Sequence, residues 1–304
     1  MNILLEKENG LIKHSFFCVL NPGVKRIHIL NAGDSPYEKG WQDYAPFESA
    51  DGKVWTRVKN GDYKDKVFSF EVTKKAKYAC WFPPYDIRQM KKECHIFQKK
   101  VEGAFFLGDK DKKTIVLMAG LHPGETMGLY FLEGILKSIL SDKSFLDTYS
   151  ILVFPYVNKE GIQQRNHRLT PSGIDLNRDW KNSNNVLLNS IKKQVNDFKN
   201  LCAVIDIHGD EVSKQDYVIY NKFFQKSFLK KHCERSGFVL LKRQSFFKKF
   251  IKALIRQHKI IFSKGQSARD YFEKRGVLAI TVELSAIANT PTLCIQKGMQ
   301  FFRK

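Results

Sequence analysis

The stretch from Thr114 to Leu140 constrains the fold of this chain more than any other. It begins with an apolar run rich in β-formers, Thr114 to Ala119, and ends in apolar residues with helical spacing. The segment His122-Pro123-Gly124-Glu125 lies between these two patterns. Open α/β sheets place their functional groups at such strand-to-helix turns, at the carboxyl ends of the strands. The stretch therefore predicts an α/β sheet with a site at this turn.

His122 and Glu125 have the spacing of a metal-binding pair. A His and a Glu three residues apart can hold one cation from the same side, and Zn²⁺ accepts both ligand types at about 2.0–2.2 Å. The pair alone is weak evidence, because a helix-capping turn with an exposed His has the same sequence.

A second candidate ligand, His208, ends the apolar strand Ala203 to His208. Asp206 and His208 point to the same side of this strand, because side chains alternate with period two. A lone His at a strand end is more often only hydrogen-bonded. With His122 and Glu125, however, it would complete the three protein ligands of a catalytic zinc site.

A loop dense in planar donors, residues 165–180, lies between these two halves. It contains Arg168, Asn177 and Arg178, with Asp175 beside them. The guanidinium group of Arg binds a carboxylate through two hydrogen bonds, which Lys cannot do. A solvated basic loop is the simpler interpretation, although Asp175 then needs a structural partner.

Glu283 ends another apolar strand, 277–284. Burying a carboxylate there costs several kcal/mol unless it is paired or bound to a metal or water. Glu283 is therefore either a functional acid or a partner of a structural Arg or Lys.

Two regions of different pattern divide the chain. Residues 1–98 contain short alternating or aromatic runs separated by turn signals, which predicts a small all-β sandwich domain. Residues 99–304 alternate strand-like and helical runs, which predicts a mixed-sheet α/β/α domain. We expect strands at 114–120, 151–157, 202–208, 217–221 and 277–284, and helices at 86–100 (with a linker), 125–141, 186–200, 222–236, 244–259 and 268–275.

Composition limits the partners and the compartment. The 304 residues carry 51 basic and 31 acidic side chains, a net charge of +20 that attracts acidic peptides, nucleic acid or anionic membranes. The six cysteines are scattered without a metal or disulfide pattern, which predicts reduced thiols. No apolar run is long enough for a transmembrane helix, and Glu6 and Glu8 interrupt any secretory segment. We expect a cytoplasmic protein; its oligomeric state does not follow from these features.

The stretch 222–264 is the most basic segment, with 13 Lys or Arg residues and one acid. Its apolar residues between 247 and 258 fall on one helical face, which favours an ordinary core-facing helix with a solvated basic side. It could instead steer acidic substrates or touch a membrane or nucleic acid, but no recognised nucleic-acid module is present.

Taken together and in this order, these motifs resemble the zinc metallocarboxypeptidases of the carboxypeptidase A type. They are most similar to the cytosolic carboxypeptidase branch, which places a β-sandwich domain before the catalytic one. The matching segments are His122-Pro123-Gly124-Glu125, Asn158 with Gly161, Asn166 with Arg168, Gly173-Ile174-Asp175-Leu176-Asn177-Arg178, Asp206-Ile207-His208-Gly209 and Glu283. The branch usually has a Tyr shortly before its catalytic Glu, and residues 279–282 contain none.

The resemblance implies a Zn²⁺ cofactor bound by His122, Glu125 and His208. Such a zinc lowers the pKa of water toward about 7 and polarises the scissile carbonyl. Glu283 would be the general base that takes the proton of the water and delivers it to the leaving amine.

The resemblance also implies how a substrate would be held. Arg168 would stabilise the developing oxyanion. Asn177 and Arg178 would bind the terminal carboxylate, so the partners are peptide or protein C-termini and the reaction is hydrolysis of the last peptide bond. Arg269 lies where the branch places an Arg for acidic side chains, which suggests a preference for C-terminal Glu or Asp. In the simpler interpretation Arg269 pairs with an acid on its own helix.

Three other functions remain open from the sequence. An amidohydrolase of the aspartoacylase type shares several of the motifs, and a muropeptide carboxypeptidase would use the same chemistry. A catalytically inactive module that binds nucleic acid or membrane through its basic face is the non-enzyme alternative. The complete set of candidate catalytic residues argues against that last one.

Overall fold

One mixed sheet of eight strands organises the second part of the chain in the computed structural model, which describes residues 1–94, 98–99, 103–182, 184–220, 224, 227–242 and 265–303. The four central strands are parallel, and antiparallel strands flank them on both sides. In spatial order the strands are β11 (Gln98–Lys99), β12 (Phe105–Leu107), β14 (Tyr149–Phe154), β13 (Lys113–Ala119), β15 (Leu201–Asp210), β18 (Leu278–Ser285), β16 (Tyr217–Tyr220) and β17 (Val239–Lys242).

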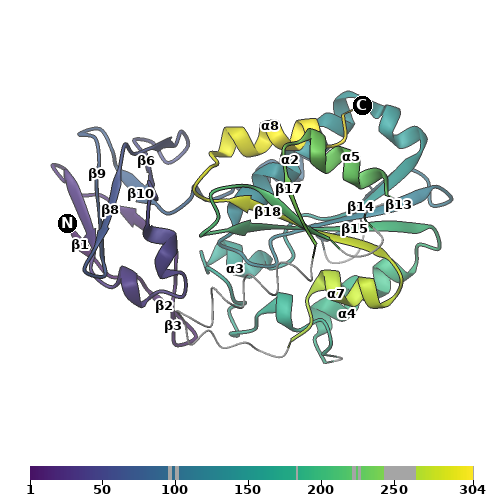
Figure 1. Ribbon diagram of the computed structural model, residues 1–304, viewed down its shortest axis with the longest axis horizontal. Coiled ribbons are helices and arrows are strands. Elements are labelled where there is room, and N and C mark those ends of the chain that lie inside the picture. The colour runs from purple at the N-terminus through teal and green to yellow at the C-terminus, as the bar shows by residue number, and fades with distance from the viewer. Residues whose placement is uncertain are drawn as a thin grey trace.

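Helices cover both faces of this sheet and make three layers (Figure 1). One face carries α2 (Thr126–Ser141), α5 (Phe228–Arg235) and α8 (Pro291–Phe301), and the other carries α3 (Lys159–Gln163), α4 (Val186–Asn196) and α7 (Ala268–Lys274). The alternation of strand side chains explains this arrangement. Ile115 and Leu117 of β13 pack into the core under α2, whereas Val116 and Met118 pack into the core under α4 and α7.

The first part of the chain is built from short strands in two four-stranded sheets. The first sheet has the order β1 (Asn2–Ile3), β5 (Arg26–Ile29), β9 (Val67–Glu71) and β8 (Gly61–Lys64), and the second has the order β4 (Phe17–Val19), β10 (Tyr78–Cys80), β6 (Phe47–Ser49) and β7 (Thr56–Arg57). A separate hairpin of β2 (Lys7–Glu8) and β3 (Leu11–Ile12) lies at the side that faces the α/β part (Figure 1). Short 3₁₀ turns at Ala32–Asp34 and Glu38–Trp41 complete this part.

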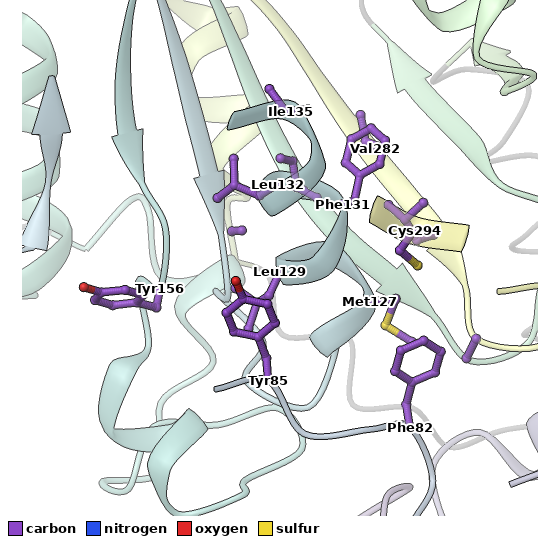
Figure 2. Packing of buried hydrophobic residues seen from close by; sticks show 14 of the residues in the cluster. Phe82, Tyr85, Met127, Leu129, Phe131, Leu132, Ile135, Tyr156, Val282 and Cys294 are labelled. Carbon is purple, nitrogen blue, oxygen red and sulfur yellow. The ribbon is translucent and has the colours of Figure 1, made fainter. Parts of the chain in front are cut away.

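The two parts share a continuous apolar core. Phe82 and Tyr85, in the segment that leads to α1 (Ile87–Glu93), lie beside Met127 and Leu129 at the start of α2 (Figure 2). The Tyr85 hydroxyl donates to Glu133 Oε2 at 2.8 Å, which gives this buried carboxylate a partner. The first part is therefore fixed against the helix that begins at the His122–Glu125 turn.

The predicted order of an all-β part before a mixed-sheet α/β/α part is confirmed. All five expected strands are present, and α2, α4 and α7 occur where helices were expected. Helix α1 lies within the helix and linker expected at 86–100, and α5 lies within the helix expected at 222–236; part of each range falls outside the described residues. Helix α8 was not predicted, although Thr290 and Pro291 form a helix-start signal, with the Thr290 hydroxyl capping the Leu293 N–H.

Part of the basic stretch 222–264 is described, and it forms α5 and β17. The helix predicted at 244–259, with its basic side, lies outside the described residues. Among the residues that are described, we find no helix with the length and apolar character that a membrane span requires.

Candidate metal centre

The side chains of His122, Glu125 and His208 converge on one buried point. Glu125 Oε1 lies 2.6 Å from His122 Nδ1, and Glu125 Oε2 lies 2.7 Å from His208 Nδ1. One ligand atom from each residue lies within 4.8 Å of the others, and all three residues are buried. Two imidazole nitrogens and a carboxylate are a donor set that suits zinc.

The sheet explains why residues so distant in sequence meet here. His122 and Glu125 follow the end of β13, where Gly120 turns the chain with a φ of +71°, and Glu125 occupies the N-cap position of α2. His208 lies near the end of β15, the parallel neighbour of β13. Adjacent parallel strands end at the same edge of a sheet, so the predicted ligands meet there.

The outward nitrogens of both histidines face carboxylates. His122 Nε2 lies 3.2 Å from Asp175 Oδ1, and His208 Nε2 lies 3.1 Å from Asp206 Oδ1. Asp206 has no exposed surface, and within the described residues neither of its oxygens has a hydrogen bond of good geometry. Carboxylates behind the ring nitrogens orient metal-bound histidines and fix their tautomers. This arrangement, with Nδ1 of each ring directed inward, fits a bound zinc ion.

The charges of this centre are strongly coupled. Burial opposes ionisation of Glu125, yet His122 and His208 hold the pKa of that carboxyl well below its usual value. Burial likewise opposes the charged form of His208, yet Asp206 and Glu125 raise its pKa well above the ordinary value. In this arrangement the positive charge favoured on His208 opposes the charge of the buried carboxylates, and a divalent cation among the same groups would also supply positive charge.

Glu283 lies on β18 directly opposite His208 in the sheet register. On the other side, Tyr217 of β16 is its register partner. Glu283 is half-buried; burial raises the pKa of its carboxyl well above the ordinary value, with His208 opposing the shift and Glu125 adding to it. The acid predicted from the sequence is thus within electrostatic reach of the candidate metal ligands His208 and Glu125.

Arg168 has two anchors. Its Nε donates to Asp175 Oδ2 at 2.7 Å, and its Nη1 donates to the hydroxyl of Tyr37 at 2.9 Å. Because Asp175 also faces His122, the guanidinium is connected to the metal centre through one carboxylate. Burial opposes the shift, but His122 and Arg168 hold the pKa of Asp175 well below its usual range. His122 and Arg168 are therefore the structural partners that the sequence analysis expected for Asp175.

Asn177 and Arg178 lie in the same short turn but differ in their surroundings. The buried Asn177 amide places Nδ2 3.1 Å from His208 Nε2, and its Oδ1 accepts the Ala268 N–H at 3.2 Å. Arg178 is exposed, and its Nη1 donates to the Asn177 carbonyl at 2.9 Å. Asn177 is therefore held inside the site, and Arg178 lies at its edge.

Arg269 begins α7 and turns toward β18. Its Nη1 donates to Thr281 Oγ1 at 3.2 Å, and its Nη2 donates to Asp270 Oδ1 at 3.4 Å. Its buried Nε has no hydrogen-bond partner among the described residues. Thr281 lies two residues before Glu283 and therefore on the same face of β18. The contact with Asp270 is the helix pairing that the simpler interpretation expected, but the guanidinium also points at the strand of Glu283.

Sequence reasoning missed residues of the first part that enter the site. Glu8 accepts the backbone N–H groups of His167, Arg168 and Leu169, and Tyr37 binds the Arg168 side chain. His167 Nε2 also lies 2.9 Å from Glu211 Oε1. Glu8, Tyr37 and Glu211 stand outside the motifs, and no spacing in the sequence relates Glu8 or Tyr37 to the loop that they contact.

Two family profiles match the chain. The cytosolic carboxypeptidase N-terminal domain matches residues 21–83, and the zinc carboxypeptidase family matches residues 87–201. A segment of 74 residues, 23% of this chain, is 43% identical to cytosolic carboxypeptidase 2 of Xenopus tropicalis. An uncharacterized protein of Zymomonas mobilis is 26% identical over 241 residues, 69% of this chain. The chain covers 62% of the Zymomonas protein and 8% of the Xenopus protein.

Solved structures share the whole fold. A metallo-carboxypeptidase from Burkholderia cenocepacia aligns with 99% of this chain and 90% of its own, at a TM-score of 0.77 and 19% identity. A metallo-carboxypeptidase from Pseudomonas aeruginosa, in complex with (2-guanidinoethylmercapto)succinic acid, aligns with 99% of this chain and 91% of its own, at a TM-score of 0.74 and 19% identity. These likenesses establish the order and arrangement of both parts.

Proposed function

We propose that this chain, which matches the cytosolic carboxypeptidase N-terminal domain over residues 21–83 and the zinc carboxypeptidase family over residues 87–201, hydrolyses the last peptide bond of peptides or protein tails. The observation that carries this proposal is the convergence of His122, Glu125 and His208 beside Glu283. Nitrogen and carboxylate donors with a neighbouring acid form the donor set of a hydrolytic zinc site. Zinc bound there acts as a Lewis acid and lowers the pKa of water.

Glu283 is the general base in this proposal. It accepts a proton from the attacking water and returns it to the amine of the departing residue. Its place opposite His208 on the adjacent strand puts the carboxylate next to the metal ligands. Burial, and after it the neighbouring carboxylates Glu125, Asp210 and Asp206, raise the pKa of its carboxyl, and the positive charge of a bound cation would oppose this shift.

Arg168 stabilises the oxyanion that develops on the scissile carbonyl. Its Nε and Nη1 are already bound to Asp175 and Tyr37, which leaves the rest of the guanidinium for the substrate. A positioned donor of this kind contributes roughly 3–4 kcal/mol to the transition state.

Asn177 and Arg178 hold the terminal carboxylate. When His208 faces a metal through Nδ1, its Nε2 carries the proton, and Asp206 is the acceptor. The Asn177 Nδ2, at 3.1 Å from that nitrogen, then has no acceptor there and can turn to a substrate carboxylate. The exposed Arg178 can supply the bidentate contact.

The same proposal includes a preference for acidic C-terminal residues through Arg269. Its side chain is 12% exposed, its Nε lacks a partner, and it lies against the strand of Glu283. A buried guanidinium with an unfilled donor favours a carboxylate ligand. The net charge of +20 would attract such substrates.

Six free cysteines, four of them buried, support the further proposal of a reducing, cytoplasmic location.

The test is amino-acid release from a peptide set ending in Glu, Asp, Lys or Leu. The zinc-loaded protein is compared with a chelated sample and with Glu283→Gln. We expect release that chelation and the substitution both abolish. Arg269→Ala should lose preference for acidic residues, whereas the control Arg275→Ala, which stacks on Tyr271, should keep it. Zinc binding without release from any peptide would refute the peptidase and point to an amidohydrolase or muropeptide substrate. Salt-sensitive nucleic-acid binding without zinc would point to a binding module.

A further inference from the structure

A carboxylate of the first part holds the loop that carries Arg168. Glu8 Oε2 accepts the His167 N–H at 2.5 Å, and Glu8 Oε1 accepts the N–H groups of Arg168, at 2.9 Å, and Leu169. Glu8 is 8% exposed and lies 160 residues before Arg168 in the chain. The three hydrogen bonds from consecutive backbone N–H groups to this one carboxylate are strong and charge-assisted. They fix the backbone from which the Arg168 side chain projects.

A hydroxyl from the same part fixes the side chain itself. The Tyr37 hydroxyl accepts from Arg168 Nη1 while Asp175 accepts from Nε, so the guanidinium is held at two points. Burial raises the pKa of Tyr37, which keeps the hydroxyl protonated at neutral pH. Tyr37 and Asp175 approach from different parts of the chain, and together they fix the rotation of the guanidinium plane.

The Arg168 loop also contacts the metal-binding turn. The Gly124 N–H donates to the His167 carbonyl at 2.8 Å. A Cβ on Gly124 would lie 2.8 Å from the His167 Cα, so only glycine permits this approach. Glu8 therefore acts on a loop that is packed directly against the segment of His122 and Glu125.

We propose that Glu8 and Tyr37 are positioning residues for Arg168, so that the first part of the chain is a component of the hydrolytic site. The inference rests on the function proposed for Arg168. Neither Glu8 nor Tyr37 contacts the substrate in this proposal; both act through the position of the Arg168 guanidinium. Glu8 sets the backbone and Tyr37 sets the side-chain orientation. Oxyanion stabilisation requires donors held within a fraction of an ångström, which explains the use of two anchors.

The test is a set of double-substitution cycles in the zinc-loaded, full-length protein. Glu8→Gln and Tyr37→Phe should each lower kcat by about 10-fold or more, as expected for losing a hydrogen bond to a charged group. KM and zinc content should stay within about two-fold of the parent values. Neither substitution should lower kcat further in an Arg168→Ala background, because the group that they position is then absent. Equal losses in both backgrounds, or losses carried by KM or zinc content, would overturn the proposal.

Matched controls exist in the same part of the chain. Glu6→Gln removes the same charge two residues from Glu8, at a side chain that is 79% exposed and pairs with Lys13. Tyr63→Phe removes a hydroxyl that donates to Glu38 instead of contacting Arg168. Both controls should retain the parent kcat. A loss in the controls equal to that in Glu8→Gln and Tyr37→Phe would reveal a general structural effect and overturn the proposal.

Hydrogen exchange supplies a readout that does not depend on activity. The amides of residues 167–169 should exchange faster in Glu8→Gln than in Glu6→Gln, because they lose their charged acceptor. Unchanged exchange would overturn the role of Glu8. If the parent protein cut no peptide, the proposed function would fail, and the hold of Glu8 on the loop would be judged by exchange alone.

Discussion

The side of the site proposed to bind the metal and the side proposed to bind the substrate carboxylate are built differently. His122, Glu125 and His208 are buried, and a second carboxylate faces each histidine. Arg178 is exposed, and within the part of the chain that the structure describes its side chain hydrogen-bonds to the carbonyl of its neighbour Asn177. The metal side is therefore assembled before any ligand arrives, whereas the substrate side still has donors to offer.

Electrostatics explains the difference. Buried charges are tolerated only when opposite charges or hydrogen bonds compensate them, and the metal side contains its own compensation in Asp175 and Asp206. Arg178 stays in contact with water, which solvates its charge until a substrate carboxylate binds. Arg168 lies between these cases, because two of its donors are already paired.

The largest effect should follow from removing a metal ligand. His208→Ala leaves two candidate ligands and removes one of the two imidazoles that face Glu125, so zinc affinity should fall by more than the about 10- to 100-fold typical of losing an outer partner. Activity should drop to background. Metal analysis after dialysis checks this, with His28→Ala, which contacts Ser69 in the first part, as control. Full zinc occupancy in His208→Ala would contradict the assignment of His208 as a ligand on the buried side of the site.

Arg168→Ala should have the next largest effect. Loss of the oxyanion donor should lower kcat by about 10²- to 10³-fold, since such donors act mainly in the transition state. Zinc content should be unchanged. Steady-state kinetics beside Arg165→Ala, an arginine three residues away that stacks on Phe17, measure the difference. A kcat within two-fold of the parent would contradict the role given to this guanidinium.

Asp206→Asn should have an intermediate effect on the metal side. The substitution keeps the shape of the side chain but removes the charge behind His208, and zinc affinity should fall by about 10- to 100-fold. Competition with a chelator measures the affinity. Asp43→Asn, at an exposed carboxylate paired with Lys214, should leave it unchanged. Equal affinities in the two variants would show that Asp206 does not orient the ring.

Arg178→Ala should have the smallest effect and should act on KM. Losing one exposed contact to the terminal carboxylate should raise KM by about 10-fold, roughly 1.4 kcal/mol, with kcat little changed. Peptide titrations beside Lys181→Ala, an exposed cation three residues away, test this. A fall in kcat with an unchanged KM would mean that Arg178 belongs to the preassembled side.

Most candidate metal ligands and their carboxylate partners could be predicted from the sequence, because they occur in short local motifs. His122 and Glu125 are three residues apart at a strand end, and Asp206 and His208 are two apart on one strand. Strand periodicity and the meeting of parallel strand ends place such residues together without further information.

The contribution of the first part could not be predicted in this way. Glu8 binds backbone N–H groups, which have no sequence signature, and Tyr37 meets Arg168 across 131 residues. Helix α8 was missed although Thr290 and Pro291 signal its start, and the basic helix expected at 244–259 stays a prediction. Contacts made through the backbone or between distant segments become visible only in the folded chain.

The most direct measurement of the central claim uses one peptide in two forms, with a free C-terminal carboxylate and with a C-terminal amide. Mass spectrometry follows both with the zinc-loaded protein, beside Glu283→Gln. The site described here predicts that only the free acid loses its last residue and that Glu283→Gln leaves both forms intact. Cleavage of the amide at an equal rate, or no loss from the free acid in a protein that binds zinc, would contradict it.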